Sequence, residues 1–217
     1  MSADLTVTIA QLRAWGACFI DARVAGLRDH LGCEVGEDEP IPLTTWAAVA
    51  WTDEDGVHSE TSVRDLAWAA AHTGSSGRRL VVAWAADCAE RALLAWEARR
   101  PSDSRPRDAI VLVRRWLADP ESVAREELFA AAAAGYAAAY AAAADAGYAA
   151  AYADAGYAAA YAAAADAAGA AAYAAAYTAY AADDAAAAAA DAAADVVAER
   201  AWQRARLLQH LAGEVSP

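Results

Sequence analysis

The apolar positions of the first 76 residues recur at intervals of three or four, in short runs separated by polar stretches. The clearest run stops at Gly32 and comprises Phe19, Ile20, Val24, Leu27 and Leu31. That spacing predicts an amphipathic helix ended by glycine. Thr8 can cap an earlier helix that runs through Trp15, and Ser62 with Asp65 resembles a capping box for a later one.

Two further segments complete the prediction for this region. Either Thr44 or Thr45 can cap a helix before the acidic sequence DEDG at 53–56, and its apolar residues are Trp46, Val49 and Ala50. The sequence HTGSSG at 72–77 is rich in glycine and serine, which predicts a flexible loop. We therefore expect residues 1–76 to form short helices joined by polar loops.

Residues 78–119 show the clearest helical pattern. The stretch 78–100 contains neither glycine nor proline and predicts one helix of about five or six turns, which Pro101 helps to end. Ser104 is a candidate N-cap for a second helix and Pro106 suits its first turn. The buried stripe of this second helix is expected to contain Ile110, Val113 and Leu117. Two helices with a short loop predict an antiparallel hairpin.

Residues 130–195 have a composition unlike that of the rest of the chain. These 66 residues comprise 45 Ala, 9 Tyr, 7 Asp, 4 Gly and one Thr. One helix of this length would run about 100 Å, whereas a compact chain of 217 residues has a radius of gyration of about 17 Å. We therefore expect breaks near Gly147 and Gly169, with Gly135 or Gly156 as alternatives, and a stack of the resulting helices.

The tyrosines of this segment form four pairs with a spacing of four residues, at 136/140, 148/152, 157/161 and 173/177. Residues at this spacing touch on a helix surface. The repeat DAGYAAAYA occurs at 145–153 and again at 154–162, and a nine-residue period turns consecutive repeats to opposite sides of a straight helix. The tyrosines can fill the seams of the stack or form a contact surface with the Asp residues. Tyr173 and Tyr177 are candidate binding residues.

Together these patterns predict an all-α protein with a bundle of short N-terminal helices, a central antiparallel helix hairpin and an alanine-rich helical stack. Residues 1–121 would form a Trp-containing helical region that includes the Arg-rich hairpin at 78–119. Residues 122–217 would form an Ala- and Tyr-rich helical region packed on it, within one continuous domain. An amphipathic helix at 196–211 would end the chain.

The net charge of −13 and the isoelectric point of about 4.6 limit the partners that this chain can bind. Nucleic acid and anionic membranes need basic patches, so neither is expected, whereas a basic protein partner suits the charge. Three widely spaced cysteines do not resemble a disulfide framework, and the N-terminus does not resemble a signal peptide. We expect a cytoplasmic protein without a transmembrane segment.

Candidate chemistry concentrates between residues 84 and 107. Cys88 lies beside carboxylates, which disfavour a reactive thiolate, so we expect a buried structural cysteine and no catalytic residues. The four histidines are scattered and no Cys or His pair has ligand spacing, so neither a metal site nor a cofactor is expected. The arginines of the hairpin can pair with its carboxylates or bind an acidic group. The candidate binding residues here are Trp84, Asp87, Cys88, Glu90, Arg91, Arg105 and Arg107.

Three sequence segments resemble a known family. WAADCAERAL at 84–93, PSDSRPRDAI at 101–110 and RRWLADP at 114–120 are similar to the immunity-protein-five-like family of bacterial toxin systems, and LRAWGAC at 12–18 looks like a motif of some members. The tail matches in character only, because a low-complexity sequence aligns with many others, and it carries Tyr where relatives often have His or Arg. The resemblance implies an all-α protein that binds a protein partner and neutralises a toxin, without catalytic residues.

Two functional hypotheses follow. The first is a non-enzymatic interaction module, an immunity protein that occludes a toxin or effector, such as a basic nuclease, through acidic and Tyr-bearing helices. The second is a small-molecule or nucleotide-binding protein, or an enzyme, with a site near Trp84, Cys88, Arg91 and Arg107. An ice-binding or assembly element is disfavoured because Thr178 stands alone. The partner and the oligomeric state stay open.

Overall fold

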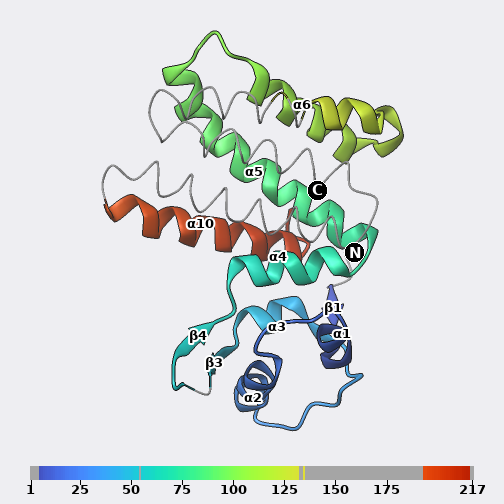
Figure 1. Cartoon of the computed structure of the whole chain (residues 1–217), viewed down its shortest axis with the longest axis vertical. Helices are drawn as coiled ribbons and strands as arrows, with labels where there is room; N and C mark the ends of the chain where they lie inside the picture. Colours follow the sequence, from blue (N-terminus) through green and yellow to red (C-terminus); the bar gives the residue numbers. More distant parts are fainter. Residues whose placement is uncertain (1–4, 54, 132–133, 135–192, 216–217) are drawn as a thin grey trace.

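A computed structural model describes residues 5–53, 55–131, 134 and 193–215. Figure 1 shows a mostly helical molecule in which α5 lies between α6 and α10, with α4 on the side of these helices that faces the N-terminal elements. The elements in chain order are β1 (Thr6–Val7), α1 (Ile9–Ala14), α2 (Ile20–Leu31), β2 (Ile41–Pro42), α3 (Leu43–Ala47), β3 (Ala50–Thr52), β4 (His58–Glu60), α4 (Val63–His72), α5 (Ser75–Arg99), α6 (Arg105–Ala118), the 3-10 helix η1 (Pro120–Ser122) and α10 (Ala193–Leu211).

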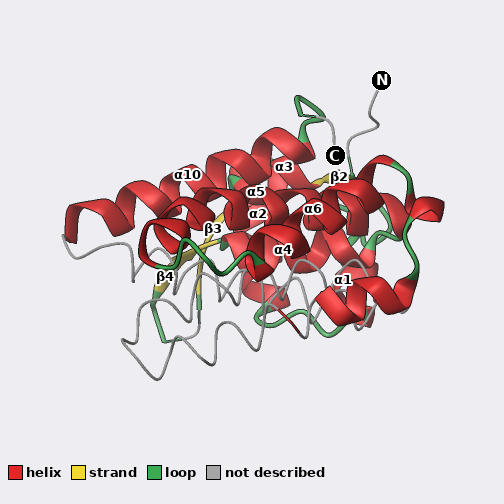
Figure 2. Ribbon diagram, turned by 90° about the horizontal axis from the view of Figure 1, so that it is seen from above, coloured by secondary structure: helices red, strands yellow, loops and turns green. Residues whose placement is uncertain are grey.

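The protein is mostly helical, as predicted, but it is not strictly all-α, because the N-terminal region contains two small antiparallel sheets (Figure 2). One sheet pairs β1 with β2, and the other pairs β3 with β4. The sequence at 53–56 was expected to end a helix, but Asp53, Asp55 and Gly56 lie between β3 and β4. The Asp53 carboxylate accepts hydrogen bonds from the backbone N–H groups of Asp55 and Val57, and Gly56 has a φ of 78°.

The helix expected around Trp46 is also shorter than predicted. It begins at Leu43 after Pro42, without a side-chain cap, and ends at Ala47. Ala50 already belongs to β3, where strand pairing replaces the expected helical turn. Pairing between the two strands of this short hairpin outweighs local helical spacing here.

Other N-terminal predictions are confirmed. Thr8 and Gln11 form a capping box at the start of α1, and Ser62 and Asp65 form another at the start of α4. The helix that was expected to end at glycine is α2, and Gly32 follows it in the left-handed conformation. Each of these signals depends on residues within one helical turn.

The prediction of a flexible loop at 72–77 was wrong. Ser75 begins α5, so only two residues separate α4 from α5. A side chain at Gly77 would place its Cβ 1.9 Å from the carbonyl oxygen of Ala70 and 2.2 Å from Oγ1 of Thr73. Glycine therefore lets the two helices approach closely here, and its position inside a helix does not indicate mobility.

The hairpin predicted at 78–119 is confirmed, with α5 and α6 packed side by side. Pro106 lies in the first turn of α6 as expected, although Ser104 makes no capping hydrogen bond. Every residue of α5 from 80 to 89 is buried. One side of this stretch packs in a core with the N-terminal elements and α10, and the other packs against α6. A helix that is buried all round needs neighbours on both sides.

The predicted C-terminal helix is confirmed as α10. Leu207 and Leu211 are buried in the same core as Trp84. Arg204 donates a 2.7 Å hydrogen bond to the carbonyl oxygen of Thr61 and a second one to that of Ala47. The end of the chain is thereby joined to the N-terminal region. The predicted helix stack with its tyrosine pairs lies outside the described residues.

Candidate functional site

Asp87, near the middle of α5, lies among three donor side chains. Arg206 Nε and His210 Nε2 of α10 are 2.6 and 2.7 Å from its Oδ2, and Arg114 of α6 donates to its Oδ1. Only 9% of the Asp87 side chain is exposed. Burial alone would raise the pKa of Asp87, but the hydrogen bonds from His210, Arg114 and Arg206 outweigh it and hold this pKa far below its usual range.

Arg114 extends this arrangement to a second carboxylate. Its Nε and Nη2 atoms lie 2.8 Å from the two carboxylate oxygens of Glu90, one turn after Asp87 on α5. The hydrogen bonds to Glu90 and then Asp87 raise the pKa of Arg114 despite its partial burial. We call Asp87, Glu90, Arg114, Arg206 and His210 the Asp87 network. It connects three helices, and Arg114 and Asp87 each have two or more partners.

Two aromatic contacts support the same packing of α10 on α5. The indole Nε1 of Trp84 donates a 3.1 Å hydrogen bond to the carbonyl oxygen of Gln203, and this side chain is fully buried. The Arg91 guanidinium lies 4.6 Å from the ring centroid of Trp202. Trp84, Asp87 and Arg91 thus all contact α10, because residues three to four apart share a helix face.

The Asp87 network suits a structural role rather than catalysis. A carboxylate held ionised by three donors is a poor general base near neutral pH, because its proton affinity is too low. His210 faces a carboxylate acceptor through Nε2, so that nitrogen carries the proton, while its buried Nδ1 has no partner in the described structure. We therefore interpret the network as the connection that holds α6 and α10 on α5.

The outer side of the hairpin carries a second arrangement. Arg107 Nε of α6 lies 2.6 Å from Glu97 of α5. This ion pair joins the same two helices as the pair of Arg114 with Glu90. Leu94 is 72% exposed and Val111 is 54% exposed, and each follows a member of these pairs by four residues. Helical geometry therefore places both apolar side chains on the same side of the hairpin as the ion pairs. We call this side the hairpin face: Glu90, Leu94, Glu97, Arg107, Val111 and Arg114.

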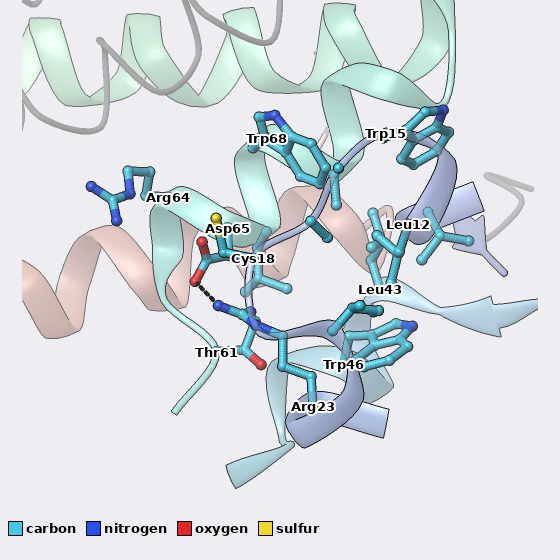
Figure 3. A pocket seen from close by; sticks show the side chains of 16 residues that line it. Leu12, Trp15, Cys18, Arg23, Leu43, Trp46, Thr61, Arg64, Asp65 and Trp68 are labelled. Carbon is cyan, nitrogen blue, oxygen red and sulfur yellow. Dashed lines mark hydrogen bonds and ion pairs between the residues drawn. The ribbon is translucent and has the colours of Figure 1, made fainter. Parts of the chain in front are cut away.

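A pocket of about 460 Å³ lies among α1, α2, α3 and α4. Figure 3 shows Trp15 and Trp68 together on one side of it, and Arg23 reaching toward Asp65 on another. Arg23 Nη2 is 3.0 Å from Asp65 Oδ2. Burial would raise the pKa of Asp65, but hydrogen bonds from Ser62 and the nearby Arg23 lower it overall. This carboxylate is thus ionised and already paired.

The candidate residues that the structure describes fall into five environments. Trp84 and Cys88 are buried in the main core, and Asp87 is central to the network described above. Arg105 pairs with Asp103 at the start of α6, 2.6 Å away. The hairpin face contains Glu90 and Arg107, and α10 contacts Arg91. Tyr173 and Tyr177 lie outside the described residues, and none of the candidate residues lines the pocket.

Sequence reasoning missed Arg206 and His210. They are four residues apart in the amphipathic C-terminal helix, a spacing that puts both on one face and could have marked them. Nothing in the sequence connects them with Asp87, which is more than a hundred residues earlier. Arg114 was noticed among the hairpin arginines, but the sequence alone did not distinguish it from its neighbours.

Within the described part of the chain, no group of three or more His, Cys, Asp or Glu side chains is arranged to hold a metal ion. The helices described there include none that has both the length and the apolar character needed to cross a membrane.

Comparison with known proteins identifies one family. Neither curated proteins nor solved structures give a significant match. The family model described as "Imm-5 like putative immunity protein" matches residues 71–210, which include α5, α6 and nearly all of α10. The Asp87 network and the hairpin face therefore lie within the matched part, whereas the pocket lies before it. Since the match covers well over half of the sequence, the chain belongs to the Imm-5-like immunity protein family.

Proposed function

We propose that this protein is an immunity protein that binds a toxin and occludes it, without an enzymatic step of its own. The observation that carries the proposal is the family match over residues 71–210. The proposed partner is a basic protein, for example a nuclease toxin, and the proposed contact surface is the hairpin face.

The hairpin face supports this proposal by its composition. Leu94 and Val111 supply exposed apolar area between two interhelical ion pairs. An apolar centre with a polar rim is the usual arrangement of a protein-binding surface. The Asp87 network supports it further, because a rigid surface loses less conformational entropy on binding.

The charge of the chain supports a basic partner. With a net charge of −13, the protein attracts a cationic surface over a distance of about 8–10 Å at physiological salt. Such attraction raises the association rate and disfavours acidic partners. We therefore expect the affinity for the toxin to fall as the salt concentration rises.

Co-expression tests the proposal directly. A candidate toxin, such as any toxin-like protein encoded beside this gene, would be expressed in a bacterial host with and without the immunity protein, and colony survival would be counted. We expect survival to be restored, and we expect calorimetry with a catalytically inactive toxin variant to show a stable complex that weakens with salt. Killing that continues undiminished in the presence of well-expressed protein would refute the proposal. If survival is restored but the affinity does not depend on salt, only the proposal of a basic partner would be refuted.

A further inference from the structure

The pocket among α1, α2, α3 and α4 has no role in the function proposed above. Its volume of about 460 Å³ lies within the range of about 300–1,000 Å³ that is usual for small-molecule sites. Protein interiors are otherwise close-packed, with few voids larger than a water molecule. The pocket is neither a closed cavity nor a flat surface, so a molecule can enter it from solvent.

Most of the residues that line the pocket are apolar. They include Leu12 of α1, Ile20 of α2, Leu43 of α3 and Leu66 of α4. Water in such a space finds few hydrogen-bond partners, so an apolar group that replaces it gains free energy. The lining therefore suits an apolar molecule better than a group of ordered waters.

One side of the pocket is aromatic, as Figure 3 shows for Trp15 and Trp68. The two rings meet edge to face with centroids 6.2 Å apart, and His72 stacks on Trp15 at 5.0 Å. A 2.9 Å hydrogen bond between His72 Nδ1 and the carbonyl oxygen of Trp68 holds the imidazole in place. These contacts restrict both indole rings. The side that they form suits a flat aromatic ring.

The charges beside the pocket are already compensated. Arg23 Nη2 is 3.0 Å from Asp65 Oδ2, so the two side chains form an ion pair without net charge. Arg64 also lines the pocket, but Figure 3 shows its guanidinium pointing away from the other labelled side chains, and it takes part in another interaction. A charged ligand would therefore lose hydration without gaining an unpaired opposite charge.

The other polar groups around the pocket offer a ligand little hydrogen bonding. The hydroxyl of Thr61 already donates to the carbonyl oxygen of Val49, 3.3 Å away. The Nε atom of Arg23 and the indole Nε1 of Trp46 have almost no exposed surface, so a ligand in the pocket cannot bond to them. The affinity of a ligand must therefore come from apolar and aromatic contacts.

We infer that the pocket among α1, α2, α3 and α4 binds a small, neutral molecule with a flat aromatic ring. The ring lies against Trp15 and Trp68, and the leucine and isoleucine side chains of the lining complete the contact. The inference does not rest on the immunity role, because the lining residues precede the part of the chain matched by the family model.

Three compounds with the same indole ring and different charges test the inference on the full-length protein. 3-Methylindole is neutral, indole-3-acetate is anionic and tryptamine is cationic. Calorimetry should show 3-methylindole binding about tenfold tighter than either charged compound, because the charged compounds lose hydration without compensation. Equal affinities, tighter binding of either charged compound, or no binding of 3-methylindole at millimolar concentration would overturn the inference.

The neutral compound 1-octanol separates an aromatic site from a general apolar one. It is similar in size to 3-methylindole but has a flexible chain in place of a ring. 3-Methylindole should bind more tightly, because a rigid ring loses less conformational entropy and can pack on Trp15 and Trp68. Equal or tighter binding of 1-octanol would overturn the aromatic class of ligand.

Substitutions that fill the pocket locate the bound compound. Ala69→Phe should abolish binding of 3-methylindole. Ala17→Phe places the same ring at a less buried position of the lining, before α2, and provides the test if Ala69→Phe does not fold. Ala118→Phe, at the exposed end of α6 and outside the pocket, is the matched control and should leave the affinity unchanged. Thermal unfolding verifies that each variant is folded, and unchanged affinity in a folded pocket variant would exclude the pocket.

Asp65→Asn tests whether the ion pair sets the preference for a neutral ligand. The variant leaves Arg23 without its carboxylate partner, so the affinity for indole-3-acetate relative to 3-methylindole should rise about threefold or more. Asparagine can still accept hydrogen bonds from Ser62, which preserves the start of α4. Asp21→Asn removes an exposed carboxylate of α2 that does not line the pocket and is the matched control. An unchanged ratio of affinities in Asp65→Asn would overturn the role of the ion pair.

Discussion

Arg206 Nε lies 2.6 Å from Asp87 Oδ2, although 119 positions separate the two residues in the sequence. The contact joins α10, which ends the described chain, to the middle of α5. His210 reaches the same oxygen from the next turn of α10, and Arg114 reaches the other oxygen from α6. One carboxylate therefore connects both helices to α5.

Asp87→Asn should destabilise the protein by about 2–3 kcal/mol. Removing one member of a buried ion pair typically costs about 3–5 kcal/mol, and the partial exposure of Arg114 and Arg206 reduces that cost. Urea unfolding followed by circular dichroism measures the change. Glu90→Gln is a matched control, since it removes a more exposed carboxylate from the same Arg114 and should cost less than about 1 kcal/mol. Equal losses in the two variants would contradict the central role of Asp87.

The contribution of Asp87 should depend on pH in one direction. Its pKa in the folded chain is lowered below the unfolded value of about 3.9, so the contribution is fully present above about pH 5. It is then lost progressively as the pH falls toward the folded-state pKa. The difference in unfolding free energy between wild type and Asp87→Asn should therefore be larger at neutral pH than near pH ~3. A difference that grows on acidification would show that the sign is wrong.

Gly77→Ala should destabilise the joint between α4 and α5 by about 1–3 kcal/mol. The added Cβ would meet the Ala70 carbonyl oxygen at 1.9 Å, so the helices must separate. Gly36→Ala is the matched control, because its nearest contact would be 3.9 Å away. That control should be neutral or slightly stabilising. Thermal unfolding compares the two, and a stabilising Gly77→Ala would contradict the close approach.

Leu94→Gln combined with Val111→Gln should weaken toxin binding at least tenfold without changing the unfolding free energy by more than about 0.5 kcal/mol each. Both side chains are exposed, so their loss affects the surface rather than the core. Val57→Gln changes an apolar residue with the same 54% exposure as Val111, but on the loop between β3 and β4, and should leave binding unchanged. Calorimetry with inactive toxin provides the measurement. Unaltered affinity of the double variant would exclude the hairpin face.

The correct predictions and the failures have a common physical origin. Thr8, Ser62 with Asp65, and Gly32 were interpreted correctly because a cap acts within one turn. The strands were missed because β1 pairs with β2 far along the chain, and because strands of two or three residues, such as β3 and β4, leave no periodic pattern. Gly77 was wrongly interpreted as part of a loop, because what requires glycine there is the close approach of a carbonyl oxygen on another helix.

The sequence by itself determined the helix hairpin, the helix boundaries set by local caps, the acidic charge and the family. Only the tertiary structure decided which charged residues connect the helices. Among the hairpin arginines it selects Arg114, and it brings Arg206 and His210 to Asp87. It also assembles the pocket from residues on four helices. The physical reason is that local signals act over one helical turn, whereas ion pairs and pockets depend on how the helices pack.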